Sequence, residues 1–459
     1  MSRGFESHTL RKHGDCVPGV EFPQPERTRV SKQNDVKGAR RQTVARHGVL
    51  TSPNAFAQML TIVAVGLAVV LVSVLGITGF AVLNTAQAIG ANAVSLGDDE
   101  EIPPSIGAIE GGVNLLLVGT DSCEGQDVKL FPRCAHDAGG ERNDVTMLVH
   151  ISDNPRRVTV VSFPRDMFVP IPSCPYADGT GNYSAMSAQK INSSYGYGGL
   201  ACTVLTVEAL TGEDIQFAGA IRWTGVINMS DAIGGVDVCV EGDINDKHTG
   251  LHLKAGNHTL QGEEALQFLR IRHGIGDGSD LGRISNQQQF MGSMVRKLQS
   301  ESVLANPSVL FNLATTAMAQ VENKQLVLSQ SLTNPTLMVQ IAMAVKDVDY
   351  SDIVFVQYPT AYGSVNGESG VLPLTEPADV LFQALRDNKA LELTGEASGG
   401  FGVEVTGEAT KPSASPTATP GKSSSPSPSA TEEPDEAVAL PSQVTGSTAA
   451  DVTCTKPEG

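Results

Sequence analysis

Two aspartates stand where apolar runs end or begin, so a folded sheet would bring them to strand ends. Asp121 closes the segment NLLLVGTD, and Asp144 lies in ERND at 141–144, directly before a second apolar run. Carboxylates at neighbouring strand ends suit Mg²⁺, which combines a few carboxylate oxygens with phosphate oxygens of a substrate. The pair predicts a metal site with Asp121 and Asp144 as ligands. Ordinary turn chemistry, in which Asp is common, is the alternative.

Arginines occupy two further segments. Arg165 and Asp166 end the strand pattern SFPRD at 162–166, where a simple surface ion pair is the alternative. In LRIRHGIGDGSDLGRISNQQQF at 269–290, Arg270 and Arg272 alternate with period two, so an extended chain points them to one side.

The helix expected after that segment adds more polar side chains. Asp280 is placed as its N-cap, and Arg283 and Gln287 lie four residues apart on one face. Guanidinium groups match phosphate oxygens in bidentate geometry, so the cluster predicts a pocket for a doubly charged anion. A solvated charged face is the alternative.

The elements that must position these residues alternate along the chain. Strands are expected at Val113–Val118, Met147–Ile151, Val158–Phe163, Ile215–Ile221 and Val236–Val240. Helical patterns occupy 186–211, 223–233, 260–269 and 281–300. Interleaved strands and helices predict an α/β layered domain with a largely buried sheet.

Charge divides the chain into a basic beginning and an acidic remainder. Of the net charge of −18, residues 1–58 contribute +5, from ten Lys/Arg and five Asp/Glu, so the other 401 residues carry −23. Binding of the main body to bulk nucleic acid is excluded, because phosphate backbones need a basic footprint. Residues 1–45, polar and without apolar periodicity, are expected to be a disordered cytoplasmic tail.

An uncharged apolar segment follows the basic part. Residues 59–83 form a stretch of about 37 Å as a helix, enough to span a hydrocarbon core. Basic residues before it and Asp98 to Glu101 after it orient the N-terminus to the cytoplasm. We therefore expect a single-pass protein of the cell membrane, with an extracytoplasmic domain at 105–395.

Six of the seven cysteines fall on the predicted outer side, where disulfides form: Cys123, Cys134, Cys174, Cys202, Cys239 and Cys454. Fifteen connectivities are open, although Cys123 with Cys134 would close a short loop and Cys174 with Cys202 a longer one. Residues 396–459 are expected to be a Pro/Ser/Thr-rich disordered tail. Its last stretch regains apolar residues and ends at Cys454, so docking through a disulfide is the alternative there.

Several of these motifs occur together in a known family. In order along residues 112–298, NLLLVGTDS, ERNDVTMLVHI, RVTVVSFPRDMFVPIP, KINSSYGYGG, GGVDVCV and LQGEEALQFLRIRHGIGDGSDLGRISNQQQF resemble the LytR-CpsA-Psr family. The resemblance implies a three-layer α/β/α domain with a mixed central sheet. It also implies binding of a polyprenyl pyrophosphate lipid with Mg²⁺ and transfer of an anionic glycopolymer, such as a teichoic acid, to peptidoglycan.

The resemblance assigns roles to individual residues. Asp121 and Asp144 match the family's metal-associated acids. The residues that match its pyrophosphate-binding set are Arg142, Arg165, Arg270, Arg272, Arg283 and Gln287. Of these matches, Arg142, Arg165 and Asp144 are expected to be catalytic. The sequence departs from the family pattern at Cys123 and Asn286, which stand where arginines are common, and at Asn143 and Val145, which replace the usual Ser and Thr beside Asp144.

The implied reaction is an in-line attack by a peptidoglycan hydroxyl on the phosphorus nearer the glycan, with polyprenyl phosphate as leaving group. Positioning and charge stabilisation dominate such reactions. The apolar segments 308–321 and 335–345, with Met318, Met338 and Met343, are candidates to line a lipid cavity, and ordinary core is the alternative. Two other functions stay open, a polyprenyl-pyrophosphate pyrophosphatase and a non-enzymatic lipid-binding regulator of the envelope.

Overall fold

The computed structural model describes residues 93–96, 112–136, 140–176, 180–300, 303, 307–395, 402–410 and 437–458. The chain divides into two compact units, 1–71 and 72–459, and every described residue lies in the second. The predicted tail at 1–45 and the predicted membrane span at 59–83 lie outside the described residues. Within the described ranges, no helix combines the length and apolar character needed to cross a membrane.

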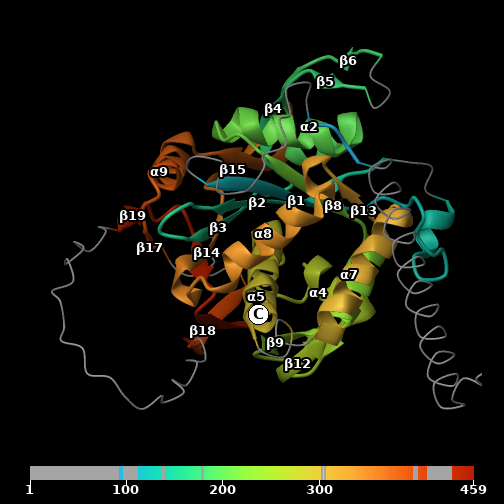
Figure 1. Cartoon of the computed structure of the whole chain (residues 1–459), viewed down its shortest axis with the longest axis vertical. Coiled ribbons are helices and arrows are strands. Elements are labelled where there is room, and N and C mark those ends of the chain that lie inside the picture. Colours follow the sequence, from blue (N-terminus) through green and yellow to red (C-terminus); the bar gives the residue numbers. More distant parts are fainter. Residues whose placement is uncertain are drawn as a thin grey trace, which may run out of the picture. The chain divides into compact units, whose positions relative to one another are not determined.

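A seven-stranded sheet forms the centre of the second unit (Figure 1). In spatial order its strands are β13 (Leu326–Leu328), β8 (Phe217–Ile221), β1 (Val113–Thr120), β2 (Asn143–Ile151), β3 (Val158–Ser162), β14 (Ile353–Gln357) and β20 (Gly446–Thr448). Strand β1 is parallel to β8 and β3 is parallel to β14, whereas β1 with β2 and β2 with β3 are antiparallel. The predicted α/β fold with a mixed central sheet is confirmed.

Helices cover both faces of this sheet (Figure 1). On one face α2 (Ser194–Thr211) and α9 (Thr375–Arg386) bury Leu200, Val204 and Leu381 against the strands. On the other face lie α5 (Asp280–Gln299), α7 (Pro307–Glu322) and α8 (Pro335–Lys346), which contribute Met291, Val321 and Leu337. Each fully buried aliphatic side chain adds roughly 1.5–3 kcal/mol, so these two apolar layers dominate the stability of the fold.

A second sheet packs against the far side of α5. Its strands, in order, are β12 (Gly256–Leu260), β9 (Val236–Val240), β21 (Asp451–Thr455) and β18 (Val403–Glu408). Val238, Phe268 of α4 (Gly262–Arg270) and Phe290 of α5 share its apolar core. Helix α5 therefore lies between two sheets, and its polar residues 285–289 are all buried.

Short elements complete the structure. The two-stranded ribbons are β4 (Phe168–Ile171) with β7 (Met186–Lys190), β5 (Cys174–Pro175) with β6 (Asn182–Tyr183), β10 (Ile244–Asn245) with β11 (His252–Leu253), β15 (Thr360–Val365) with β16 (Glu368–Pro373), and β17 (Leu391–Leu393) with β19 (Val438–Leu440). Helix α3 (Trp223–Ala232) follows β8, and single 3₁₀ turns are η2 (Pro132–Ala135), η3 (Ile191–Ser193), η4 (Ser331–Thr333) and η5 (Tyr350–Asp352).

The predicted strands all form, but one predicted helix is partly wrong. The pattern at 186–211 begins with a strand, because Lys190 and Gln189 of β7 pair with Phe168 and Val169 of β4. The helix begins only at Ser194, after the 3₁₀ turn η3. Tertiary pairing with β4 thus outweighs the local helical pattern of the first residues.

The prediction of a disordered tail at 396–459 is wrong for residues 402–410 and 437–458, which form β18, β19, β20 and β21. Strand β20 extends the central sheet, and β21 enters the second sheet between β9 and β18. The disulfide Cys239–Cys454 fixes β21 to β9. The other two disulfides are Cys123–Cys134 and Cys174–Cys202.

Candidate active site at the sheet edge

The sheet topology brings the predicted polar residues to one edge. Strand β1 ends at this edge, and because β2 is antiparallel to it, β2 begins there. Strand β3 runs antiparallel to β2 and so ends there as well. Asp121, Asp144 and Arg165 follow or begin these three strands, so residues 44 positions apart in the sequence meet at one place.

A network of ion pairs occupies this edge. Nη1 of Arg165 lies 2.5 Å from Oδ1 of Asp144. Oδ1 of Asp280 receives Nη2 of Arg272 at 2.6 Å and Nη2 of Arg283 at 2.9 Å. Nε of Arg165 lies 3.7 Å from the same oxygen of Asp280, so one carboxylate links the three arginines. We call these five residues the arginine cluster.

Two neighbours extend the arginine cluster. Asp166 lies 3.4 Å from Nε of Arg165, and Nζ of Lys190 lies 3.2 Å from the other oxygen of Asp166. Asp166 and Asp144 therefore contact different nitrogens of Arg165. Burial raises the pKa of Asp166, but the charges of Arg165 and Lys190 outweigh it and hold the pKa below its ordinary value.

The cluster keeps its groups charged despite partial burial. Desolvation pushes the pKa of Asp144 upward, but Arg283 and Arg165 together lower it below its ordinary value. For Arg165, burial lowers the pKa, and the carboxylates of Asp144 and Asp280 raise it by more. Burial, together with the neighbouring charge of Arg283, lowers the pKa of Arg272. An additional anion would therefore relieve repulsion among the arginines.

Three buried polar atoms of the cluster have no hydrogen-bond partner within the described chain. They are Nε of Arg165, Nε of Arg283 and Oδ2 of Asp280. A buried unpaired donor or acceptor costs about 1–3 kcal/mol, so a concentration of them in one place indicates a site built for another molecule.

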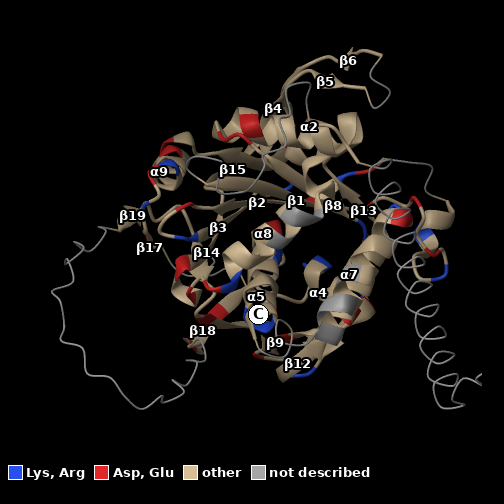
Figure 2. Cartoon of the chain, viewed as in Figure 1, with Lys and Arg blue, Asp and Glu red and all other residues tan. Residues whose placement is uncertain are grey.

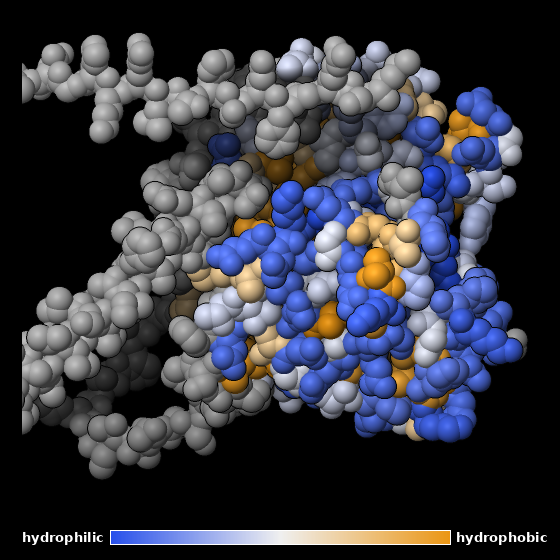
Figure 3. All heavy atoms as spheres, turned by 90° about the vertical axis from the view of Figure 1, so that its right-hand side faces the viewer, coloured by the Kyte–Doolittle hydropathy of each residue, from blue (hydrophilic) through white to orange (hydrophobic). Residues whose placement is uncertain are grey.

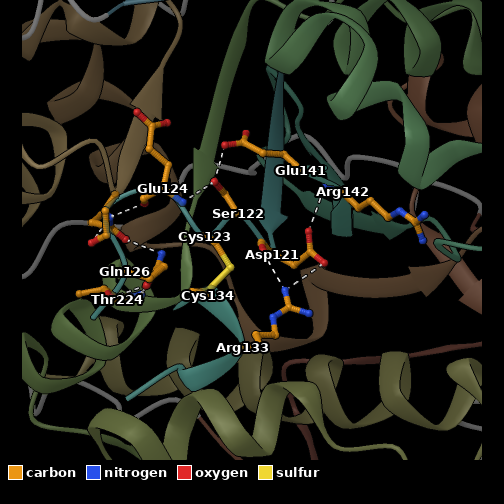
Figure 4. The surroundings of a disulfide bond; sticks show 12 residues. Asp121, Ser122, Cys123, Glu124, Gln126, Arg133, Cys134, Glu141, Arg142 and Thr224 are labelled. Atoms are coloured by element: carbon orange, nitrogen blue, oxygen red, sulfur yellow. Dashed lines mark hydrogen bonds and ion pairs between the residues drawn. A yellow bond between two sulfur atoms is a disulfide. The ribbon is translucent and has the colours of Figure 1, made fainter. Parts of the chain in front are cut away.

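Asp121 and Arg270 form a second group beside the arginine cluster. Oδ1 of Asp121 accepts the backbone N–H of Arg142 at 2.8 Å, while the Arg142 side chain is exposed and points away from Asp121 (Figure 4). The guanidinium of Arg270 lies 4.3 Å from the ring centre of Trp223. Burial lowers the pKa of Arg270, and the charges of Asp144 and Asp121 act in the opposite direction.

Gln287 is buried and contacts the end of α4. Its Nε2 donates to the carbonyl of Leu269 at 2.9 Å, and Nδ2 of Asn286 donates to the carbonyl of Phe268 at 2.7 Å. These two bonds attach α5 to the end of α4. They thereby fix Arg270 and Arg272 relative to Arg283. Figure 2 shows basic residues at one end of α4, a helix that packs against α5.

Asp280 is not the N-cap that the sequence suggested. Ser279 caps α5, because its hydroxyl accepts the N–H of Gly282 at 3.2 Å. Asp280 is the first helical residue, and its carboxylate is free to bind Arg272 and Arg283 instead. A carboxylate in the first turn also has a favourable interaction with the helix dipole.

The C-terminal segment supports the loop between Arg272 and Asp280. The backbone of Glu458 donates to the carbonyl of Gly274 at 3.0 Å, and its Oε2 accepts the N–H of Gly274 at 2.8 Å. The hydroxyl of Thr455 bonds Asn286 and Gln289 of α5. A segment predicted to be disordered therefore holds both the loop and the helix of the arginine cluster.

Three residues at this edge were not predicted. Arg133 binds Asp121, Trp223 packs under Arg270, and Lys190 binds Asp166. Arg133 lies in a loop without periodicity, and Trp223 begins a helix whose apolar pattern resembles ordinary core. Only the fact that Trp223 is the single tryptophan of the chain distinguishes it in the sequence.

Comparison with known proteins identifies the family. The model of the LytR-CpsA-Psr family matches residues 80–386, about two thirds of the chain. The chain belongs to the LytR-CpsA-Psr family. The family match includes the whole arginine cluster, whereas β18 to β21 lie beyond it.

Curated relatives match over part of their length. The cell wall biosynthesis protein LcpA of Corynebacterium glutamicum is 28% identical over 302 residues, which cover 59% of this chain and 54% of LcpA. The regulatory protein MsrR of Staphylococcus aureus is 29% identical over 191 residues, 41% of this chain and 50% of MsrR. This chain thus spans about half the length of the curated relatives it matches.

Solved structures of the family are similar at low identity. TagT of B. subtilis is 21% identical with a TM-score of 0.45, covering 64% of this chain and 99% of that chain. The LytR-Csp2A-Psr enzyme from Actinomyces oris is 22% identical with a TM-score of 0.43, covering 60% and 90%.

Proposed function

We propose that this LytR-CpsA-Psr protein is a membrane-anchored phosphotransferase that moves an anionic glycopolymer from a polyprenyl-pyrophosphate carrier to peptidoglycan, forming a phosphodiester. The arginine cluster, in which three buried polar atoms make no hydrogen bond within the described chain, carries the proposal. Three guanidinium groups linked through one carboxylate can turn to a pyrophosphate, whose non-bridging oxygens accept charge-assisted hydrogen bonds.

Each residue has a separate part in the proposed reaction. Arg165, Arg272 and Arg283 bind and orient the pyrophosphate and stabilise the charge that develops as the bond to polyprenyl phosphate breaks. Asp144 and Asp166 hold Arg165 in place through its two sides. Gln287 acts indirectly, by fixing the end of α4.

Mg²⁺ fits the acidic residues of this edge when it shares the substrate's oxygens. The described residues contain no cluster of three His, Cys, Asp or Glu side chains that would hold a metal by themselves. Mg²⁺ is commonly held by one or two carboxylates with phosphate oxygens, and Asp121 and Asp144 supply that number. The ion would neutralise negative charge on the pyrophosphate.

A polyprenyl chain needs an apolar surface beside the pyrophosphate site. The predicted cavity segments form α7 and α8, in which Val321 and Leu337 are buried while Met338 and Met343 are 41% and 53% exposed. Exposed methionines are suited to a flexible lipid because their side chains adapt in shape. We propose that these two helices contact the prenyl chain and that the protein is anchored by residues 59–83 with its N-terminus in the cytoplasm.

Complementation of a strain that lacks the protein tests the proposal. Asp144→Ala and Arg165→Ala should be made at normal levels, yet fail to restore attachment of the glycopolymer to the wall. If both variants restore it fully, catalysis at this edge is the wrong account and a binding or regulatory role is favoured. Release of phosphorylated glycan without attachment would instead indicate a pyrophosphatase.

A further inference from the structure

The connection between β1 and β2 forms a loop that lies against the proposed site. Cys123 and Cys134 close this loop with a disulfide (Figure 4). Nη2 of Arg222 lies 2.8 Å from a carboxylate oxygen of Glu124 and 2.8 Å from one of Glu141, so both ends of the loop are attached to the end of β8. The loop appears at the right of Figure 1, on the side that Figure 3 shows to be mainly hydrophilic.

Arg133, the neighbour of Cys134, is the basic residue that this loop places at the site. Its Nη2 donates to the backbone oxygen of Asp121 at 3.0 Å and lies 3.4 Å from Oδ2 of the same residue. Its guanidinium lies 4.4 Å from the ring centre of Trp223, the indole that Arg270 contacts at 4.3 Å. Two guanidinium groups therefore share one indole ring.

This arrangement holds two positive charges together. The nearby charge of Arg133 lowers the pKa of Arg270 in addition to the larger effect of burial. The carboxylate of Asp121 offsets part of the repulsion, and contact with the face of an indole offsets a further part. Phosphate oxygens at the two guanidinium groups would offset more, because they would add charge-assisted hydrogen bonds to these contacts.

We propose that Arg133 is an additional binding residue for the pyrophosphate, and that the Cys123–Cys134 disulfide positions it. The inference rests on the proposed function of the arginine cluster and adds a second set of donors, Arg133 and Arg270, on the Asp121 side. Almost half of the Arg133 side chain is exposed, 48%, so Asp121 and Trp223 fix its plane while the group still faces solvent.

Binding of inorganic pyrophosphate to the full-length oxidised protein, measured by isothermal titration calorimetry with Mg²⁺ present, tests the role of Arg133. Arg133→Ala should raise the Kd roughly three- to tenfold, a modest effect because the contact is partly in water. Arg133→Lys should recover part of the affinity. Lys129→Ala, which removes an exposed charge from the same loop, is the matched control and should leave the Kd unchanged.

The single tryptophan supplies a second readout. Because Trp223 contacts both Arg133 and Arg270, saturating pyrophosphate should change its emission in the wild-type protein. Unchanged emission at saturation would overturn the assignment.

A double-mutant cycle tests the disulfide. Cys123→Ser with Cys134→Ser should weaken binding about as much as Arg133→Ala, and should add nothing in the Arg133→Ala background. If the losses of binding free energy from the cysteine substitutions and from Arg133→Ala are fully additive, the disulfide does not act through Arg133, and the proposed role of the disulfide is wrong.

The experiment separates this inference from the proposed function. If Arg165→Ala loses pyrophosphate binding while Arg133→Ala binds like wild type, the inference about Arg133 is wrong, and the arginine cluster is still supported as the pyrophosphate site. If the wild-type protein does not bind pyrophosphate, both fail.

Discussion

Replacement of Arg165 by alanine separates the chemical role of the arginine cluster from its structural role. Arg165 makes the shortest ion pair of the cluster, 2.5 Å to Asp144, and its side chain is 25% exposed. Removing one partner of a fully buried pair costs about 3–5 kcal/mol, but here Arg272 and Arg283 remain near the carboxylates and water reaches the site. We therefore expect a loss of about 1–2 kcal/mol in the free energy of unfolding.

The effect on the reaction should be larger than the effect on stability. A charge-assisted contact contributes about 1.5–3 kcal/mol, so the rate of transfer should fall roughly ten- to a hundredfold if Arg165 acts in the transition state. Arg165→Lys keeps the charge without the planar fork and should recover only part of the rate. The assay is the initial rate of transfer from a lipid-linked oligosaccharide to peptidoglycan fragments, with denaturant unfolding of the same samples.

The matched control is Arg386→Ala. Nη1 of Arg386 lies 2.6 Å from Oε1 of Glu213, at the end of α9. The Arg386→Ala substitution therefore also removes an arginine from an ion pair. Its transfer rate should equal that of wild type. Wild-type activity of Arg165→Ala, or an equal loss in Arg386→Ala, would refute the assignment.

Three other predictions concern acid stability, the C-terminal strand and the metal. Burial lowers the pKa of His150 from 6.5 to about 4. Between these two pH values the unfolded chain therefore binds a proton that the folded protein does not bind. Stability should thus fall by about 2 kcal/mol between pH 7 and pH 5 in denaturant titrations, and His150→Gln should remove this dependence. Thr455→Val leaves Asn286 and Gln289 of α5 without their shared partner and should cost about 1–3 kcal/mol in the same titrations, whereas an unchanged midpoint would contradict a supporting role for the C-terminal strand. Chelation of Mg²⁺ should stop transfer and readdition should restore it, and transfer in the presence of excess chelator would exclude the metal.

The sequence predicts the central sheet well, because its strands are apolar runs bounded by polar turns. Val158–Ser162 is buried throughout and Val113–Thr120 is buried on one face and half-buried on the other, and such strands are continuous hydrophobic segments. Asp121, Asp144 and Arg165 could be predicted as neighbours for the same reason, since their places at strand ends follow from the strands themselves.

The parts that could not be predicted depend on contacts between distant segments. β21 pairs with β9 across more than 200 residues, and its sequence is short and mixed, so only Cys454 indicated docking. Asn286, which stands where the family commonly has arginine, is fully buried and bonds Thr455 of that strand. Arg133 likewise contacts Asp121 from a loop that the Cys123–Cys134 disulfide closes.

The most direct test of the central claim is the mass of the reaction product. Full-length protein is incubated with Mg²⁺, a polyprenyl-pyrophosphate oligosaccharide and peptidoglycan fragments, and the products are analysed by mass spectrometry. A glycan joined to peptidoglycan through one phosphate, formed by the wild-type protein and not by Asp144→Ala, is the predicted result. Free phosphorylated glycan, or lipid that is bound but unchanged, would contradict the transferase and favour a pyrophosphatase or a lipid receptor.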